Sequence, residues 1–355
     1  MDVFTLDIRV KKTDNSRLNE LDKSNIEFGK VYSDHMLIAD YVDGAWNKAE
    51  IIPYGTMSMS PATSFFHYGQ AIFEGVKAYK DPEGNPIIFR PQDNWKRMNR
   101  SSIRMGMPAI PEELFMEGMR QLVDLDKDWI PEADRTSLYI RPFMMAMDEF
   151  IGIKPTTRFR FMIITSPAGP YYAEPVSIYV DENYVRAFPG GVGYTKAAGN
   201  YGGSMYPMTE VRKKGYHQIL WMDGFEHKYV QEIGTMNVFF MLGDTIVTPE
   251  LSDTILEGIT RDSVITILRE NGYNVEERPL HIDEIVEAYN AGQLKEAFGT
   301  GTAASIAPIA DLTYREQKMA LPPQEDWKLA PWLREELNAI RYGRKPDTRG
   351  WVYRF

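Results

Sequence analysis

The side chain with the clearest chemical potential is Lys196, which lies in segment 193–199, Gly-Tyr-Thr-Lys-Ala-Ala-Gly. Small residues surround this lysine, and no carboxylate in the neighbouring sequence competes for its charge. A lysine held in a confined pocket can lose its proton near neutral pH and attack an aldehyde. The alternative is a glycine-rich turn that carries a solvated lysine, and the local sequence alone does not decide between the two.

Pyridoxal phosphate is a cofactor that uses such an amine, and it places further demands on a protein. It needs an anion site for its phosphate, a partner for its ring nitrogen and a hydrogen bond to its phenolic oxygen. Tyr201, five residues after Lys196, offers a hydroxyl for the phenolic oxygen. Glu232 is a candidate for the ring nitrogen, where a buried carboxylate keeps that nitrogen protonated. The alternative for Glu232 is an exposed position at the end of a strand.

Two segments after Glu232 are candidates for the phosphate site. A helix expected to start within residues 256–260, Leu-Glu-Gly-Ile-Thr, would present backbone N–H groups and a positive dipole end. The turn at residues 298–304, Phe-Gly-Thr-Gly-Thr-Ala-Ala, adds flexible backbone and two hydroxyls. Either segment alone fits an ordinary helix start or a tight loop. Their occurrence with Lys196 and Glu232 in one half of the chain favours a cofactor site.

Other functional classes are disfavoured by the sequence. The glycines of segment 199–203 match neither nucleotide-binding spacing, GxGxxG or GxxxxGK[ST]. The 40 basic and 50 acidic residues give a net charge of −10, which argues against a nucleic-acid partner. There are no cysteines, and the five histidines form no HxH or HxxxH pair, so no metal site is expected. Without a signal-peptide core or a membrane-spanning apolar run, a cytoplasmic protein is expected, with no membrane partner.

The pattern of elements predicts an α/β fold of mixed α+β character in two domains. We expect a smaller N-terminal domain at 1–168, an interdomain linker at 169–182 and a larger C-terminal domain at 183–355 that carries the cofactor lysine. Turn formers at 166–170 suggest the boundary. The helices expected are 94–105, 111–125, 258–270 and 331–337; the main strands expected are 35–41, 49–54, 86–90, 137–143, 158–164, 176–180, 218–222, 237–242 and 245–248.

The chain resembles the branched-chain amino acid aminotransferases, which are fold-type IV pyridoxal phosphate enzymes with a D-amino acid aminotransferase-like fold. Five separated motifs carry the resemblance in the same order, at residues 66–75, 139–142, 196–201, 232–237 and 299–303. The resemblance implies reversible transamination of L-leucine, L-isoleucine and L-valine with 2-oxoglutarate, which gives branched-chain 2-oxo acids and L-glutamate. It also implies that Lys196 binds pyridoxal 5'-phosphate as a Schiff base and moves a proton during turnover.

The same resemblance implies the residues that bind cofactor and substrate. Arg97, the amides of Ile259 and Thr260 and the hydroxyl of Thr302 are expected at the phosphate. The full cofactor-binding set is Arg97, Lys196, Tyr201, Glu232, Thr235, Leu256, Gly258, Ile259, Thr260 and Thr302. The substrate-binding set is Phe28, Tyr68, Phe73, Tyr139, Arg141, Tyr171, Thr302 and Ala303.

Within the substrate set, an aromatic wall would accept the branched side chain, while Tyr68 and Arg141 would hold the distal carboxylate of glutamate. The alternative for Phe28 and Phe73 is a packed aromatic core. Arg141 is harder to explain by packing, because it lies in an apolar strand and a buried arginine needs an anionic partner. One apolar wall and one tethered cation would let a single pocket take both leucine and glutamate.

The resemblance further implies a homodimer with composite active sites, in which Tyr68 and segment 151–153 approach the partner's pocket. Animal members of the family carry a CxxC pair after the turn, but Ala304 and Ala307 stand there in this chain, so no thiol switch is expected. The alternatives are a D-amino acid aminotransferase, an aminodeoxychorismate lyase, or a noncatalytic binding protein with this fold.

Overall fold

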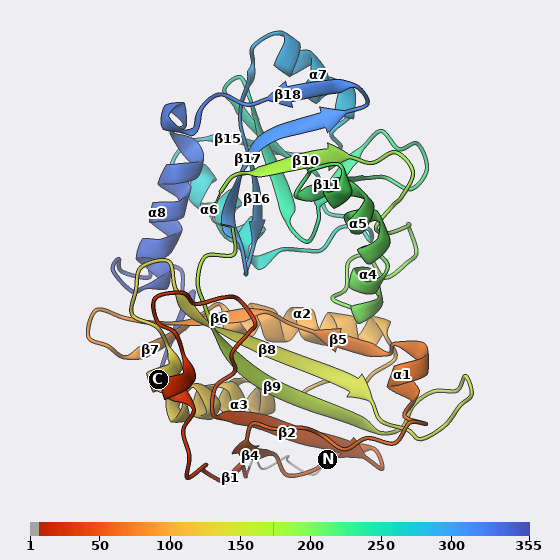
Figure 1. The fold of residues 1–355 in the computed structure, drawn as a ribbon, viewed down its shortest axis with the longest axis vertical. Coiled ribbons are helices and arrows are strands. Elements are labelled where there is room, and N and C mark those ends of the chain that lie inside the picture. The colour runs from red at the N-terminus through yellow and green to blue at the C-terminus, as the bar shows by residue number, and fades with distance from the viewer. Residues whose placement is uncertain (1–6, 173) are drawn as a thin grey trace. The chain divides into compact units, whose positions relative to one another are not determined.

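The computed structural model describes residues 7–172 and 174–355 (Figure 1). The chain divides into two compact units, each built on its own sheet. The first unit contains the residues up to Tyr171 together with Thr195–Gly199 and Ala339–Phe355. The second unit contains Tyr172–Tyr194 and Asn200–Asn338.

The first unit is built on a ten-stranded sheet with the order β1-β4-β2-β9-β8-β6-β7-β19, in which β3 pairs with β2 and β5 pairs with β8. Its pairs are antiparallel except for β1 with β4. The strands are β1 (Arg9–Val10), β2 (His35–Val42), β3 (Ala45–Trp46), β4 (Glu50–Pro53), β5 (Ala71–Phe73), β6 (Val76–Lys80), β7 (Pro86–Phe89), β8 (Ser137–Ala146), β9 (Phe159–Ala168) and β19 (Val352–Arg354). The helices are α1 (Ser64–Tyr68), α2 (Pro91–Arg104) and α3 (Glu112–Leu125), with short 3-10 turns at Leu18–Glu20 and Lys127–Trp129.

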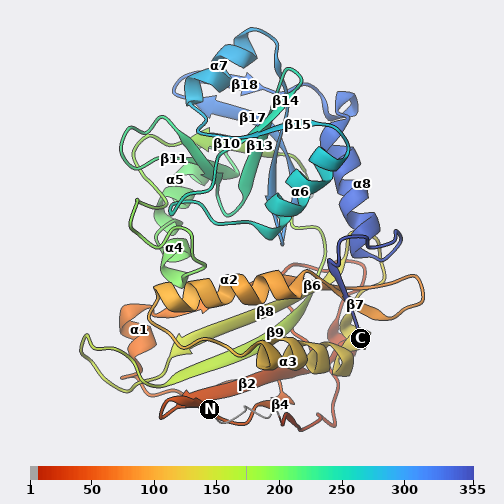
Figure 2. The same cartoon turned by 180° about the vertical axis from the view of Figure 1, so that it is seen from behind.

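Helices α2 and α3 lie across one face of this sheet, as Figure 2 shows from behind. Their apolar residues form one buried cluster with every second residue of the strands beneath them. On β8 those residues are Leu138, Ile140, Met144 and Ala146. Because side chains alternate along a strand, Tyr139 and Arg141 point to the opposite face. The packing of the two helices therefore decides which face of β8 is left for chemistry.

The second unit is built on a nine-stranded mixed sheet with the order β12-β11-β10-β17-β16-β13-β14-β15, in which β18 pairs with β17. The strands are β10 (Val176–Val180), β11 (Gln218–Met222), β12 (Val230–Ile233), β13 (Asn237–Leu242), β14 (Thr245–Thr248), β15 (Asn274–Glu277), β16 (Leu294–Gly301), β17 (Ser305–Tyr314) and β18 (Gln317–Ala320). The helices are α4 (Ala198–Gly202), α5 (Met205–Lys213), α6 (Ile259–Glu270), α7 (Ile282–Asn290) and α8 (Leu329–Arg341), with a 3-10 turn at Gln324–Asp326.

Most of the helices and strands expected from the pattern are confirmed, but the turn expected at 166–170 is wrong at its start. Ser166–Ala168 continue β9 and pair with β8 as far as Ser137. Two short returns of the chain also belong to the first unit. Residues 195–199 join it by a bridge between Ile72 and Ala197, and residues 339–355 join it through β19 beside β7. The linker and domain boundaries expected from the sequence stay a prediction.

No helix among residues 7–172 and 174–355 combines the length and the hydropathy that a bilayer crossing requires.

Glu296 on β16 caps the start of α8. Its carboxylate is 5% exposed and accepts hydrogen bonds from the backbone N–H groups of Lys328 at 2.7 Å, Leu329 at 2.8 Å and Ala330 at 2.8 Å. The first N–H groups of a helix have no partner inside the helix, and a negative charge there also complements the helix dipole. One buried carboxylate therefore fixes where α8 begins.

We expect Glu296→Ala to lower the free energy of unfolding by about 2–3 kcal/mol, because three amides lose a charged acceptor. Urea titration followed by circular dichroism measures the change. Glu335→Ala, at an exposed position of the same helix, is the control and should change stability by less than about 0.5 kcal/mol. Equal midpoints for the two variants would contradict the capping role.

Candidate active site

Lys196 is held by its backbone against the first unit. Its carbonyl accepts a hydrogen bond from the Phe73 N–H at 3.1 Å, and its N–H donates to Ser101 Oγ at 3.1 Å. The amine nitrogen lies 4.6 Å from the centroid of the Phe73 ring. The main chain is thus fixed on both sides of the side chain, and the amine is directed over an aromatic face.

A buried ion pair lies close to this lysine. Glu74 is fully buried and forms a two-point contact with Arg97, at 2.8 and 2.7 Å, and it also accepts from Asn94 Nδ2 at 2.7 Å. Burial raises the pKa of the Glu74 carboxyl, but the charges of Arg97 and Lys196 and these hydrogen bonds hold it below its ordinary value. The sequence around Lys196 contains no carboxylate, but the fold brings the Glu74 carboxylate close enough to interact electrostatically with the Lys196 amine.

Arg141 lies among aromatic rings. Its guanidinium carbon is 4.6 Å from the Phe73 ring centroid and 5.2 Å from that of Tyr139, and Nη2 donates to the Tyr139 hydroxyl at 2.9 Å. Its Nε is buried without a hydrogen-bond partner, and among the described residues no carboxylate forms an ion pair with Arg141. The sequence predicted that this arginine needs an anion, and the described part of the chain does not provide one.

Three residues of the expected aromatic wall come together in the first unit. The Phe28 ring packs edge-on against Tyr139 at 4.8 Å and against Tyr171 at 5.2 Å between centroids. A Cβ on Gly75 would overlap the Tyr139 hydroxyl, so a larger residue there would displace the Tyr139 ring. Tyr68, at the end of α1, is 43% exposed, and no ring contact in the described part of the chain joins it to this group.

In the second unit, Glu232 is a buried carboxylate and not an exposed one. It is 3% exposed, lies 2.8 Å from Arg186 Nε, and accepts the Leu256 N–H at 2.7 Å. Arg186 also donates to the carbonyls of Gly193 at 2.9 Å and Thr254 at 2.5 Å. An opposite charge and an N–H donor beside a carboxylate favour its charged form, which is the form that can hold a protonated ring nitrogen.

Asn237 connects Glu232 to two other expected segments. Its amide donates to Glu232 Oε1 at 3.2 Å and to the Leu256 carbonyl at 2.9 Å, and a Cβ on Gly258 would overlap its Oδ1. In the sheet, Asn237 is opposite Thr300, two residues before the turn that joins β16 to β17. Glu232, the turn before α6 and the Thr302 turn therefore converge within one unit.

The remaining predicted cofactor and substrate residues lie in turns and at helix starts of the second unit. Thr235 is exposed in the turn between β12 and β13, and Tyr201 is partly buried in α4. Thr302 and Ala303 are partly buried in the turn between β16 and β17. Ile259 and Thr260 form the first turn of α6, whose N-cap, Gly258, has extended backbone and no capping side chain.

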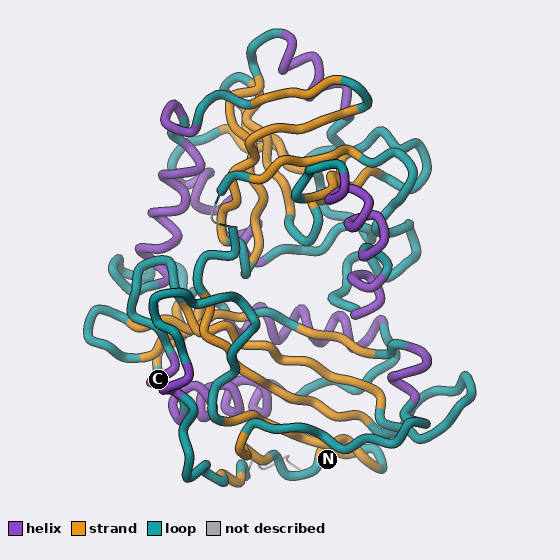
Figure 3. The backbone as a smooth tube through the Cα atoms, in the orientation of Figure 1, coloured by secondary structure: helices purple, strands orange, loops and turns teal. Residues whose placement is uncertain are grey.

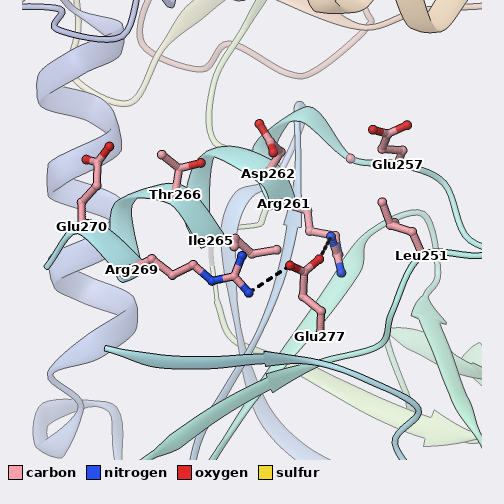
Figure 4. A pocket seen from close by; sticks show the side chains of 10 residues that line it. Leu251, Glu257, Arg261, Asp262, Ile265, Thr266, Arg269, Glu270 and Glu277 are labelled. Atoms are coloured by element: carbon pink, nitrogen blue, oxygen red, sulfur yellow. Dashed lines mark ion pairs between the residues drawn. The ribbon is translucent and has the colours of Figure 1, made fainter. Parts of the chain in front are cut away.

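A pocket of about 330 Å³ lies along the side of α6, and Gly258 is part of its wall. Figure 4 shows how Glu277 on β15 lies between Arg261 and Arg269 of the helix, at 2.9 and 3.1 Å. These ion pairs tie α6 to the neighbouring strand. They leave the helix little freedom to shift, so its first turn is fixed relative to the strand.

Sequence reasoning missed four polar residues that are buried beside the predicted ones: Glu74, Arg186, Asn237 and Lys77. Lys77 on β6 is opposite Tyr139, and burial, with the nearby charge of Arg341, lowers its pKa to about 7. The available signal was a charged residue inside an otherwise apolar run, as in segment 71–78.

No group of three or more acidic, histidine or cysteine residues in the described part of the chain could hold a metal ion.

The chain is similar to known proteins over most of its length. The model of the family described as amino-transferase class IV matches residues 71–312. The chain belongs to the class IV aminotransferases. Branched-chain-amino-acid aminotransferase 2 of Bacillus subtilis is 44% identical to it over 349 residues, covering 97% of this chain and 96% of that protein. The family predicted from the five motifs is confirmed.

Solved class IV structures confirm the fold class as well. The branched-chain aminotransferase of Thermoproteus uzoniensis with norvaline has a TM-score of 0.74 at 26% identity, covering 90% of this chain and 99% of that one. The branched-chain amino acid aminotransferase of T.th. complexed with N-(5'-phosphopyridoxyl)-L-glutamate has a TM-score of 0.72 at 28% identity, covering 89% and 98%.

We expect Glu74→Gln to destabilise this class IV aminotransferase by about 3–5 kcal/mol near neutral pH, because Arg97 then loses its buried counter-charge. The folded-state pKa of Glu74 lies below its ordinary value of 4.5, so the stability conferred by its charge is present above about pH 4.5 and disappears as the pH falls through the folded-state pKa. Denaturant titration of both proteins across this range measures the difference.

Glu117→Gln provides the matched control. Glu117 also contacts an arginine, Arg120, at two points of 2.7 and 2.6 Å, but this pair is about one-third exposed. Exposed pairs contribute about 0–1 kcal/mol. A loss for Glu74→Gln no larger than that of the control, or one that grows as the medium is acidified, would contradict the account.

Proposed function

We propose that the protein is a pyridoxal phosphate-dependent transaminase that exchanges an amino group between L-leucine, L-isoleucine or L-valine and 2-oxoglutarate. The products are branched-chain 2-oxo acids and L-glutamate, formed in two half-reactions of a ping-pong cycle. The identity to the Bacillus subtilis enzyme supports the amino-acid class. The glutamate moiety bound by the T.th. enzyme supports the second substrate.

One observation carries the proposal: two cations of different kinds lie within cation–π distance of one aromatic ring. The Lys196 amine and the Arg141 guanidinium are each 4.6 Å from the Phe73 centroid. Both cations border the same ring, and we propose that the amino end of a five-carbon dicarboxylate is directed toward Lys196 and its distal carboxylate toward Arg141. The buried Nε of Arg141, which has no hydrogen-bond partner among the described residues, fits such a guest.

The residues present also fit pyridoxal phosphate. When bound, this cofactor supplies an aldehyde that condenses with amines and a ring that withdraws electrons from the substrate's Cα. Lys196 offers the amine for covalent attachment, and the buried Glu232, paired with Arg186, offers an acceptor for the ring N–H. The chain therefore carries a group suited to the cofactor's aldehyde in the first unit and a group suited to its ring nitrogen in the second.

The protein's own groups would then act on protons and charges. The Lys196 amine would take a proton from the substrate's Cα and deliver it to the carbon of the cofactor's aldehyde group. Glu232 keeps the ring nitrogen protonated, because its charge is held by Arg186 and the Leu256 amide. The rings of Phe28, Tyr139 and Tyr171 exclude water from the branched side chain.

The other predicted roles are part of the same proposal. Arg97, Ile259, Thr260 and the Thr302 hydroxyl would bind the phosphate, and the Thr302 and Ala303 amides the α-carboxylate. The remaining cofactor contacts would come from Tyr201, Thr235, Leu256 and Gly258, and Phe73 and Tyr68 would complete the substrate contacts.

We also propose that the protein acts as a cytoplasmic homodimer. Apolar side chains on α1 and on the β8–β9 loop support this: Phe66 is 56% exposed, Ile151 71% and Ile153 94%. A hydrogen bond from the Phe150 N–H to the Ala62 carbonyl connects the β8–β9 loop to the residues just before α1. The exposed apolar side chains of the loop and of α1 therefore lie in one region of the surface. Such a patch is typical of an interface between subunits.

Steady-state assays of the purified protein loaded with pyridoxal phosphate test the proposal. We expect turnover of L-leucine, L-isoleucine and L-valine with 2-oxoglutarate. Turnover of D-alanine alone would favour a D-amino acid aminotransferase, and turnover of aminodeoxychorismate would favour a lyase. A protein that binds no cofactor would favour a noncatalytic role.

For the lysine, we expect Lys196→Ala to abolish turnover and leave the fold intact, because the variant lacks the amine over Phe73. Borohydride reduction of the native holoenzyme should fix the label on the peptide that contains residue 196. A label on a different peptide would refute the role, and circular dichroism of the variant checks the fold.

For the arginine, we expect Arg141→Ala to reduce kcat/KM for glutamate more than for leucine, by about 2–3 kcal/mol, because a charge-assisted pair is lost. That difference corresponds to roughly 30- to 150-fold. Arg141→Lys retains the charge and should recover part of the loss. Equal losses for the two substrates would contradict the proposed use of the pocket.

A further inference from the structure

The chain from Ser16 to Asp34 forms a long loop whose two ends meet at one carboxylate. Asp34 Oδ1 accepts the Arg17 N–H at 2.8 Å, and Oδ2 accepts the Ser16 hydroxyl at 2.6 Å. Oδ2 also accepts the indole N–H of Trp129 at 2.9 Å. Asp34 and Trp129 are both buried, so the loop is closed on itself and attached to the core at the same point.

Little regular structure holds this loop in shape. Apart from the 3-10 turn Leu18–Glu20 it runs as turns and irregular chain, which Figure 3 shows as a loop. Arg17 adds bonds from its guanidinium to the carbonyls of Tyr32 at 3.1 Å and Ser33 at 2.9 Å. These bonds again join the first residues of the loop to the last. The conformation of the loop therefore depends on side chains at its base.

Phe28 lies near the middle of this loop and packs against Tyr139 and Tyr171. Beside it, the Gly169 N–H donates to the Ile26 carbonyl at 3.2 Å. A Cβ on Gly169 would lie 2.6 Å from that oxygen, which is closer than any normal contact. The middle of the loop therefore docks at a position where only a glycine fits.

We propose that Asp34 is a positioning residue for substrate selection: by closing the loop, it holds Phe28 against Tyr139 and Tyr171 and thereby sets the fit for branched side chains. This inference rests on the proposed function, in which Phe28 contacts the substrate's side chain. A wall on a loop discriminates between substrates only if the loop is held in one conformation. Asp34 provides that restraint from a distance, without touching substrate or cofactor.

The experiment compares kcat/KM for L-leucine with that for L-alanine, whose methyl group is too short to need the wall. We expect Asp34→Ala to reduce the leucine value by about tenfold or more, mainly through KM, with a much smaller change for alanine. Phe28→Ala should give the same selective loss. The double variant Asp34→Ala/Phe28→Ala should be no worse than Phe28→Ala, because both changes remove one and the same contact.

Two further variants distinguish a change in loop position from a general loss of folded structure. Gly169→Ala leaves Asp34 untouched but displaces the Ile26 carbonyl, and it should reproduce the leucine-selective loss. Asp22→Ala is the matched control in the same loop: the Asp22 carboxylate accepts from its near neighbour Ser24, at 2.9 Å from the N–H and 2.6 Å from the hydroxyl. Asp22→Ala should leave kcat/KM unchanged for both leucine and alanine.

Equal losses for leucine and alanine in Asp34→Ala, or losses that add to those of Phe28→Ala, would overturn the inference and leave Asp34 as a residue that merely stabilises the fold. Those outcomes do not affect the proposed function, because the wild-type enzyme would still transaminate leucine. Absence of leucine transamination in the wild-type protein would overturn the proposed function and this inference together.

Discussion

Two backbone hydrogen bonds at Lys196, one to Phe73 and one to Ser101, are the contacts on which the candidate site depends. A lysine side chain has four rotatable bonds, so its amine is placed only as well as its main chain is held. Here the chain leaves the first unit after Tyr171 and returns for Thr195–Gly199. Because Phe73 of β5 and Ser101 of α2 hold the main chain of Lys196 by hydrogen bonds, the amine stays over the Phe73 ring.

Burial of charge is the second constraint, and the chain meets it by pairing. Glu74 with Arg97 and Glu232 with Arg186 are buried ion pairs with additional hydrogen bonds, so neither leaves an uncompensated charge in the interior. Arg141 departs from this rule, since the described chain gives it aromatic faces and a hydroxyl but no carboxylate. In the described chain Arg97 and Arg186 each have a carboxylate partner, whereas Arg141 has none, and this suits Arg141 to bind the carboxylate of a ligand.

The sequence predicted the family, the fold class and most elements, because the motifs are specific and the hydrophobic periods are regular. It also predicted Lys196 and Glu232 as candidates from their residue types, and Arg141 from the family resemblance. It did not reveal Glu74 beside Lys196 or Arg186 beside Glu232, because these contacts join residues far apart in the chain. The turn predicted from Ser166–Ala168 was wrong, because these residues continue β9 and their pairing with β8 overrides the local turn preference.

The pairing of β19 with β7 has a consequence for biosynthesis. Val352 lies opposite Phe89, so one edge of the first sheet is completed by residues that leave the ribosome long after the rest of that sheet. An open strand edge is a template for unwanted pairing with other chains. During translation β7 therefore has no partner on that edge until residues 352–354 have been synthesised, and a chaperone would act most usefully in that interval.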